Sequence, residues 1–142
     1  MNIENLGCVL VIILSLMSLD VEAEDPMECL AKNIYHEARG EPREGQLAIA
    51  HVVFNRVADP RWPDTVCSVV YQRKQFSWAN VPGTTETDRV AYSYAYGVAI
   101  DAYMGKDNTS GSTHYHALWM GKAWWAKDYQ PVKIIGNHIF YR

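Results

Sequence analysis

The chain has 142 residues, 49% of them hydrophobic, which is enough to bury the core of one domain without a metal ion or several disulfides. Its formal net charge of −3 argues against a nucleic-acid-binding protein, because such proteins normally carry a basic patch. We therefore expect a single monomeric domain with no nucleic-acid partner.

An apolar run of 14 residues near the start of the chain extends from Leu6 to Leu19. This run is short for a transmembrane helix and fits the apolar region of a signal peptide, and Val21 and Ala23 supply the small residues of a cleavage site. We expect residues 1–23 to be a signal peptide and residues 24–142 to form the exported domain, in the periplasm, cell wall or extracellular space. No Lys or Arg precedes the run, so an uncleaved membrane anchor is the main alternative; after cleavage, no stable membrane association is expected.

Two of the three cysteines, Cys29 and Cys67, remain after the predicted cleavage. An even pair in an oxidising compartment indicates a disulfide, which would close a loop spanning 38 positions. Two buried free thiols are the alternative.

The start and the end of a first helix are both marked in the sequence. Asp25 is a good N-cap, Pro26 suits the first helical position, and Glu28 at the third position completes a capping-box pattern. The helix should end near Ala38, because Gly40 follows.

Glu37 lies in the last turn of this predicted helix, at the edge of an apolar stripe that includes Leu30. Partial burial and the negative end of the helix dipole both favour a protonated carboxyl. A protonated carboxyl near neutral pH is what a general acid needs. The alternative is an ordinary surface residue paired with Arg39 or Lys32.

A second helix is predicted over residues 42–57. Its apolar residues leave hardly any polar face, which is typical of a buried central helix. His51 and Asn55 lie one turn apart in it, and we expect them to be hydrogen-bonded core groups. A third helix is predicted over residues 65–71 with Asp64 as its cap.

A fourth helix is predicted over residues 87–104. The three- and four-residue spacing of its apolar side chains indicates core scaffold, with Val90 and Tyr94 in the buried stripe beside Ala91, Val98 and Ala102.

The C-terminal quarter changes to a two-residue period, which predicts strands at residues 113–116, 132–135 and 138–141. Gly136 and Asn137 can form the turn between the last two strands. The sequence therefore predicts an α+β domain, with helices followed by a small antiparallel sheet.

Four sequence blocks carry a family resemblance. They are IYHEARGEPREGQLAIAHVVFNRV, DTVCSVVYQRKQFSW, THYH and IGNHIFYR, at residues 34–57, 64–78, 113–116 and 135–142. Together they resemble the spore-cortex-lytic (SleB-type) cell-wall hydrolase family, which is similar to lytic transglycosylases and lysozymes. The resemblance implies a lysozyme-like or lytic-transglycosylase-like helical domain, peptidoglycan as substrate, Glu37 as the catalytic residue, and no cofactor or metal.

Glycan cleavage between N-acetylmuramic acid and N-acetylglucosamine is the expected activity. One glutamate suffices for a lytic transglycosylase, which the resemblance favours, because the substrate's own groups replace a second carboxylate. The expected substrate contacts are Glu41, Gln75, Phe76, Ser77, Trp78, Thr113 and Tyr115. Alternatively, Glu41 could position other site residues without contacting the sugar. Trp119, Trp124 and Trp125 could pack in the core or bind sugar rings.

Two other functions compete with glycan cleavage. A zinc amidase or peptidase could use His114, His116 and His138, since two histidines two residues apart on a strand share a face. Against it, Gly40 stands where an H-E-x-x-H motif starting at His36 needs its second histidine. A non-catalytic wall-binding module is the other alternative, but it gives Glu37 no role.

Overall fold

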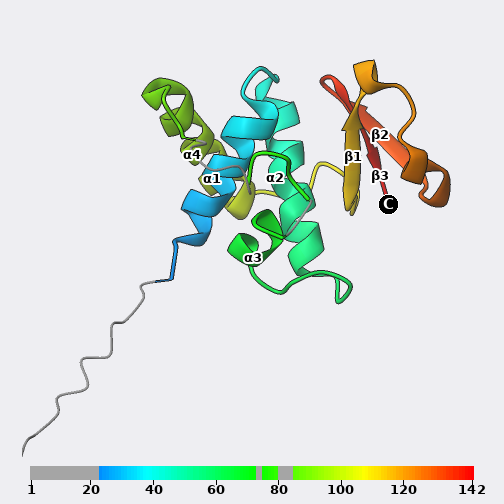
Figure 1. Cartoon of the computed structure of the whole chain (residues 1–142), viewed down its shortest axis with the longest axis horizontal. Helices are drawn as coiled ribbons and strands as arrows, with labels where there is room; N and C mark the ends of the chain where they lie inside the picture. The colour runs from blue at the N-terminus through cyan, green and yellow to red at the C-terminus, as the bar shows by residue number, and fades with distance from the viewer. Residues whose placement is uncertain (1–22, 73–74, 80–84) are drawn as a thin grey trace, which may run out of the picture.

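The computed structural model describes residues 23–72, 75–79 and 85–142. Within these residues, four α-helices precede a three-stranded sheet, so the predicted α+β class is confirmed (Figure 1). The helices are α1 (Pro26–Ala38), α2 (Arg43–Val57), α3 (Val66–Val70) and α4 (Arg89–Met104). The strands are β1 (His114–Ala117), β2 (Pro131–Ile135) and β3 (His138–Tyr141), and two short 3-10 helices, η1 (Leu118–Met120) and η2 (Trp124–Asp128), connect β1 to β2.

The predicted signal peptide lies almost entirely outside the described residues and stays a prediction. Within the described ranges, each helix is too short or too polar to cross a lipid bilayer.

The central helix is α2, which lies between the α1–α4 pair and the sheet (Figure 1). Its core side chains include Ile49, Val52 and Val53, which are fully buried, as the apolar sequence predicted. His51 and Asn55 are hydrogen-bonded, also as expected. His51 Nδ1 lies 2.9 Å from Asn108 Oδ1, and Asn55 donates to the Ser112 carbonyl over 3.0 Å. These contacts fasten the α4–β1 connection to α2.

The helix starts follow local capping. Asp25 accepts a 3.0 Å hydrogen bond from the backbone of Met27, as predicted for α1. The predicted cap of α3 was wrong: Thr65, not Asp64, accepts from Ser68 N over 3.1 Å, because Thr65 itself has the extended backbone of an N-cap. The fourth helix begins at Arg89 rather than Thr87, because Asp88 caps it by accepting from Ala91 N.

The buried face of α4 differs in part from the predicted one. Val90 and Tyr94 are 82% and 51% exposed, so their assignment to the core was wrong. Val98 and Ala102 are buried as predicted, and α4 packs through them together with Ala95 and Ala99. Because α4 packs on α1 and α2, small side chains at the contact allow a close approach of the helices.

The sheet has the strand order β1–β3–β2, and both pairs are antiparallel. Tyr115 pairs with Phe140 and Ala117 pairs with His138 in the register of β1 and β3. Since paired residues share a face, these four side chains lie on one face, and His116 with its partner Ile139 lies on the other. The predicted turn at Gly136–Asn137 is present, with Gly136 at a φ of +56°.

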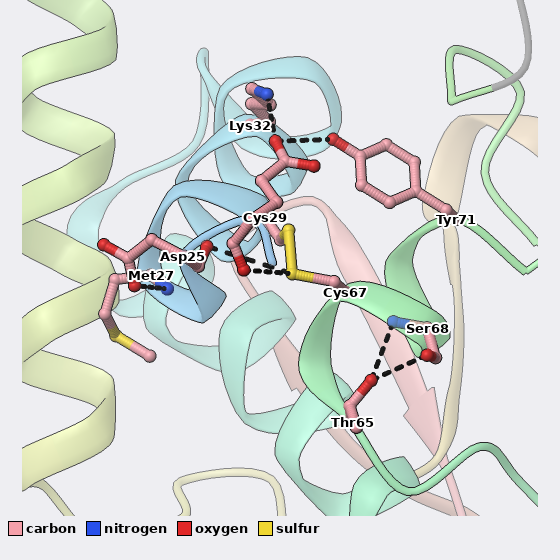
Figure 2. The surroundings of a disulfide bond; sticks show 9 residues. Asp25, Met27, Cys29, Lys32, Thr65, Cys67, Ser68 and Tyr71 are labelled. Carbon is pink, nitrogen blue, oxygen red and sulfur yellow. Dashed lines mark hydrogen bonds and ion pairs between the residues drawn. A yellow bond between two sulfur atoms is a disulfide. The ribbon is translucent and has the colours of Figure 1, made fainter. Parts of the chain in front are cut away.

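The predicted disulfide joins Cys29 in α1 to Cys67 in α3, with the two Cα atoms 5.3 Å apart (Figure 2). Beside it, Glu24 forms an ion pair with Lys32 and accepts a 3.2 Å hydrogen bond from the Tyr71 hydroxyl. The disulfide and these contacts therefore fasten the start of α1 to α3 and its C-terminal end.

Candidate active site

Glu37 is the next-to-last residue of α1 and lines a cavity of about 530 Å³. The walls of this cavity, called the cleft below, come from α1, α2, residues 75–77, the sheet and the β1–β2 connection. Partial burial raises the pKa of the Glu37 carboxyl above its ordinary value. A hydrogen bond from Tyr115 and the charge of Arg56 oppose this rise. Burial therefore favours the protonated carboxyl, while Tyr115 and Arg56 stabilise the ionised carboxylate.

Tyr115 of β1 is the direct partner of Glu37. Its hydroxyl donates to Glu37 Oε2 over 3.3 Å. Burial, followed by the charge of Glu37, raises the pKa of Tyr115 well above its ordinary value, so the phenol stays a donor. The Tyr115 ring packs edge-on against His138, with ring centroids 5.3 Å apart. The sheet register therefore aims the phenol at the end of α1.

Arg56 of α2 is a wall residue that the sequence reasoning did not select. It is 5% exposed, its Nε donates to the Thr113 carbonyl over 2.8 Å, and its guanidinium carbon lies 4.2 Å from the centroid of the Trp62 ring. Burial lowers its pKa to about 10, with the charges of Tyr115 and Glu37 acting in the other direction, so it remains a cation at neutral pH. Its Nη1 is buried and has no hydrogen-bond partner among the described residues. The sequence signal for Arg56 is an arginine in the last turn of a helix that is predicted to be buried.

Glu41 lines the cleft, but its carboxylate is engaged by the β2–β3 turn. It accepts from the backbone N and from Nδ2 of Asn137 over 2.9 and 3.1 Å, and it lies 3.5 Å from His138 Nδ1. A Cβ added at Gly136 would come within 2.2 Å of Glu41 Oε2. Glu41 therefore joins the α1–α2 connection to the sheet, which fits a supporting role better than a sugar contact.

The predicted polar-aromatic segment enters the cleft only in part. Gln75, Phe76 and Ser77 line the cavity. Trp78 does not, because its ring stacks on His36 with the centroids 4.4 Å apart. Thr113 is also outside the lining, since it is buried beside Arg56. The structure therefore places neither residue in the cleft lining, and both support the wall behind it.

Other cleft residues were not selected from the sequence. His36 lines the cavity, with its Nε2 2.9 Å from Glu86 Oε1. Trp119 and Trp125, left open between packing and sugar binding, both line it, and Trp119 is 81% exposed. Trp124 is exposed and lies outside the lining.

The three histidines of the zinc hypothesis do not converge. The register places His138 on the sheet face opposite His114 and His116. His114 packs in an aromatic cluster, with its ring centroid 3.9 Å from that of Tyr129. Among the described residues, no group of three His, Cys, Asp or Glu side chains has a metal-binding arrangement.

Sequence comparison shows which known proteins this chain resembles. The sequence model of the cell wall hydrolase family matches residues 40–141, a range that begins three positions after Glu37. A spore cortex-lytic enzyme of Halalkalibacterium halodurans is 32% identical over 122 residues, covering 83% of this chain and 35% of the relative. The spore cortex-lytic enzyme of Bacillus subtilis is 33% identical over 123 residues, covering 83% of this chain and 38% of the relative. The chain therefore spans well under half the length of these relatives.

Solved structures give the same result for the fold. The catalytic domain of the germination-specific lytic transglycosylase SleB from Bacillus anthracis superposes with a TM-score of 0.70 at 28% identity, covering 87% of this chain and 98% of that domain. The SleB catalytic domain of Bacillus cereus gives a TM-score of 0.69 at 28% identity, covering 84% and 91%. The family match, the relatives and the fold lead to one conclusion: this chain belongs to the cell wall hydrolase family.

Proposed function

We propose that this chain cleaves the glycan strands of peptidoglycan between N-acetylmuramic acid and N-acetylglucosamine, as a lytic transglycosylase with Glu37 as its acid and base. The observation that carries this proposal is the half-buried Glu37 carboxyl with a raised pKa, facing a cleft large enough for sugar rings. The similarity to a domain described as a lytic transglycosylase supports the choice of reaction.

The proposed reaction uses one carboxyl twice. Protonated Glu37 gives its proton to the glycosidic oxygen, the bond from that oxygen to C1 of muramic acid breaks, and the substrate's N-acetyl group stabilises the cationic C1. Ionised Glu37 then takes the proton of the 6-hydroxyl of the same sugar, and O6 bonds to C1. The tethered hydroxyl has a large effective concentration relative to water. Glu37 is protonated again, and no water is consumed.

The surroundings of the other carboxylates support a one-glutamate mechanism. Glu41 is held by Asn137, and Glu86 lies against His36. A glycosidase with two carboxylates needs the second one directed at the sugar or at a water. Here Tyr115 and Arg56 instead favour the ionised state of Glu37 after it has given up its proton.

Product analysis tests the reaction type. We expect soluble products of purified peptidoglycan to end in 1,6-anhydro-muramic acid, each lighter by one water than the product of a hydrolytic muramidase run in parallel. Mass spectrometry before and after borohydride reduction distinguishes the ends, since only hydrolysed ends are reducible. Exclusively reducible ends would reject transglycosylation and leave Glu37 as the acid of a hydrolase.

The pH profile of a Tyr115→Phe variant tests the tuning of Glu37. The Tyr115 hydrogen bond lowers the pKa of Glu37, so its loss should raise that pKa further. The acid must be protonated to act, so the basic limb of the rate profile should move to higher pH. We expect about a tenfold lower rate at the optimum from the lost hydrogen bond to a charged group. Tyr103→Phe, at an exposed position of α4, is the control. A limb that stays fixed or moves to lower pH would contradict this role.

We also propose that the chain is exported and acts in the cell wall as a monomer. The predicted signal peptide and the Cys29–Cys67 disulfide support export, because disulfides persist in oxidising compartments.

A further inference from the structure

A second cavity, of about 470 Å³, lies on the sheet face opposite Glu37. Ile139 and Tyr141 of β3 and His116 of β1 line it from the sheet, and Lys122 and Lys127 line it from the β1–β2 connection. The register separates it from the cleft, because Tyr115 and Phe140 face the other way. We call this cavity the rear pocket.

The rear pocket combines an apolar wall with uncompensated positive charge. Both lysines are exposed, and neither takes part in an ion pair or side-chain hydrogen bond with another described residue. None of the described residues that line the pocket is acidic. Tyr129, Tyr141 and Ile139 provide its aromatic and aliphatic surface. In a chain with a net charge of −3, such a pocket is complementary to a short acidic peptide with small aliphatic side chains.

The rear pocket and the cleft share one lining residue. His116 lines both cavities, and its Nε2 lies 2.9 Å from the hydroxyl of Tyr141, which belongs to the rear pocket. Since β1 is an edge strand of the sheet, a chain that leaves the cleft at β1 would cross this edge to enter the rear pocket. An extended peptide advances about 3.3–3.6 Å per residue, so three or four residues suffice to cross from one sheet face to the other.

We infer that the rear pocket binds the acidic stem peptide carried by the muramic acid residue, an inference that rests on the proposed function. The carboxylates of the stem would pair with Lys122 and Lys127, and its alanine methyl groups would pack on Tyr129 and Ile139. Because the peptide is covalently attached to the sugar, its binding is intramolecular once the glycan lies in the cleft. Even weak contacts then raise the affinity for peptide-bearing strands.

The test compares cleavage of glycan strands that carry stem peptides with cleavage of strands stripped of peptides by an amidase. We expect the wild-type chain to show about a fivefold higher kcat/KM on peptide-bearing strands, because two exposed ion pairs contribute about this much. The Lys122→Ala/Lys127→Ala double variant should bring this ratio close to one. Lys106→Ala, which changes an exposed lysine of the α4–β1 connection, is the matched control and should keep the wild-type ratio. The preference of the wild-type chain should also weaken as salt concentration rises.

A second measurement does not need activity. Stem tetrapeptide released by the amidase is titrated into isotopically labelled wild-type protein, and NMR shift changes are expected at Tyr129 and Tyr141 and are expected to shrink in the double variant. Equal rates on the two substrates would overturn the inference and leave the proposed function intact. If neither substrate is cleaved, the proposed function fails and the titration alone decides: shifts at these tyrosines support the pocket, and their absence overturns it.

Discussion

Glu37→Gln is expected to lower the rate of glycan cleavage by about 10²–10⁴-fold, the range that general acid–base catalysis supplies. The substitution keeps the size of the side chain and a carbonyl oxygen that can still accept from the Tyr115 hydroxyl. It removes the transferable proton and the charge, so both proposed steps fail. Product release from purified peptidoglycan measures the loss. A variant with normal turnover would end the assignment of Glu37 as acid and base.

The Glu37→Gln variant should keep its fold, and the pH dependence of its stability relative to wild type tests this. The folded-state pKa of Glu37 is raised by burial, so native protein binds more protons than unfolded protein between the two pKa values. The stabilisation given by the neutral carboxyl is complete below the unfolded pKa and is lost as pH rises through the folded pKa. The amide that replaces the carboxyl cannot ionise, so the variant should match wild type at low pH and be at least as stable at pH 7.

Glu28→Gln is a matched control, because it changes an exposed carboxyl at the other end of α1. It should keep full activity. Chemical denaturation of both variants at two pH values separates the outcomes. If Glu37→Gln unfolds or is strongly destabilised at pH 7, Glu37 has a structural role.

Features with a local physical cause could be predicted from the sequence. Asp25 and Pro26 start α1 because a cap and a fixed φ act within one turn. Gly136 makes the β2–β3 turn because its φ of +56° costs glycine little. The direction of the Glu37 pKa shift could also be predicted, because the apolar stripe beside Glu37 indicates the burial that raises this pKa.

Features that depend on a distant partner could not be predicted. Periodicity finds a stripe on α4, but it does not tell that the alanines face α1 and α2 while Val90 and Tyr94 face solvent, because the choice depends on how closely the helices approach. Glu41 meets Asn137 across 96 positions of sequence, and only the assembled sheet brings them together. Arg56 was missed because its hydrogen-bond acceptor, the Thr113 carbonyl, lies 57 positions away, and Trp62, whose ring it packs against, lies beyond the end of α2.

Replacing both disulfide cysteines by alanine, as Cys29→Ala/Cys67→Ala, is expected to lower the free energy of unfolding by about 3–4 kcal/mol. The bond closes a loop of 38 positions, and its loss returns that loop's conformational entropy to the unfolded chain. Cys29 is fully buried, so removal of its sulfur also leaves a small cavity that adds to the loss. For a domain of this size, the melting temperature should fall by about 10–15 °C.

Reduction of the wild-type protein provides the control, because it breaks the same bond without changing a side chain. Dithiothreitol should lower the stability of wild type toward that of the double variant and leave the variant unchanged. Cleavage by the folded fraction at low temperature should stay within about twofold of wild type, since Glu37 lies eight residues, or about 12 Å of helix, beyond Cys29. If the free energy of unfolding of the double variant is within about 0.5 kcal/mol of that of wild type, the packing of α3 against α1 and α2 is enough to hold positions 29 and 67 together without the disulfide. A stable but inactive variant would show instead that the bond positions the wall formed by residues 75–77, which follow α3 and reach the cleft.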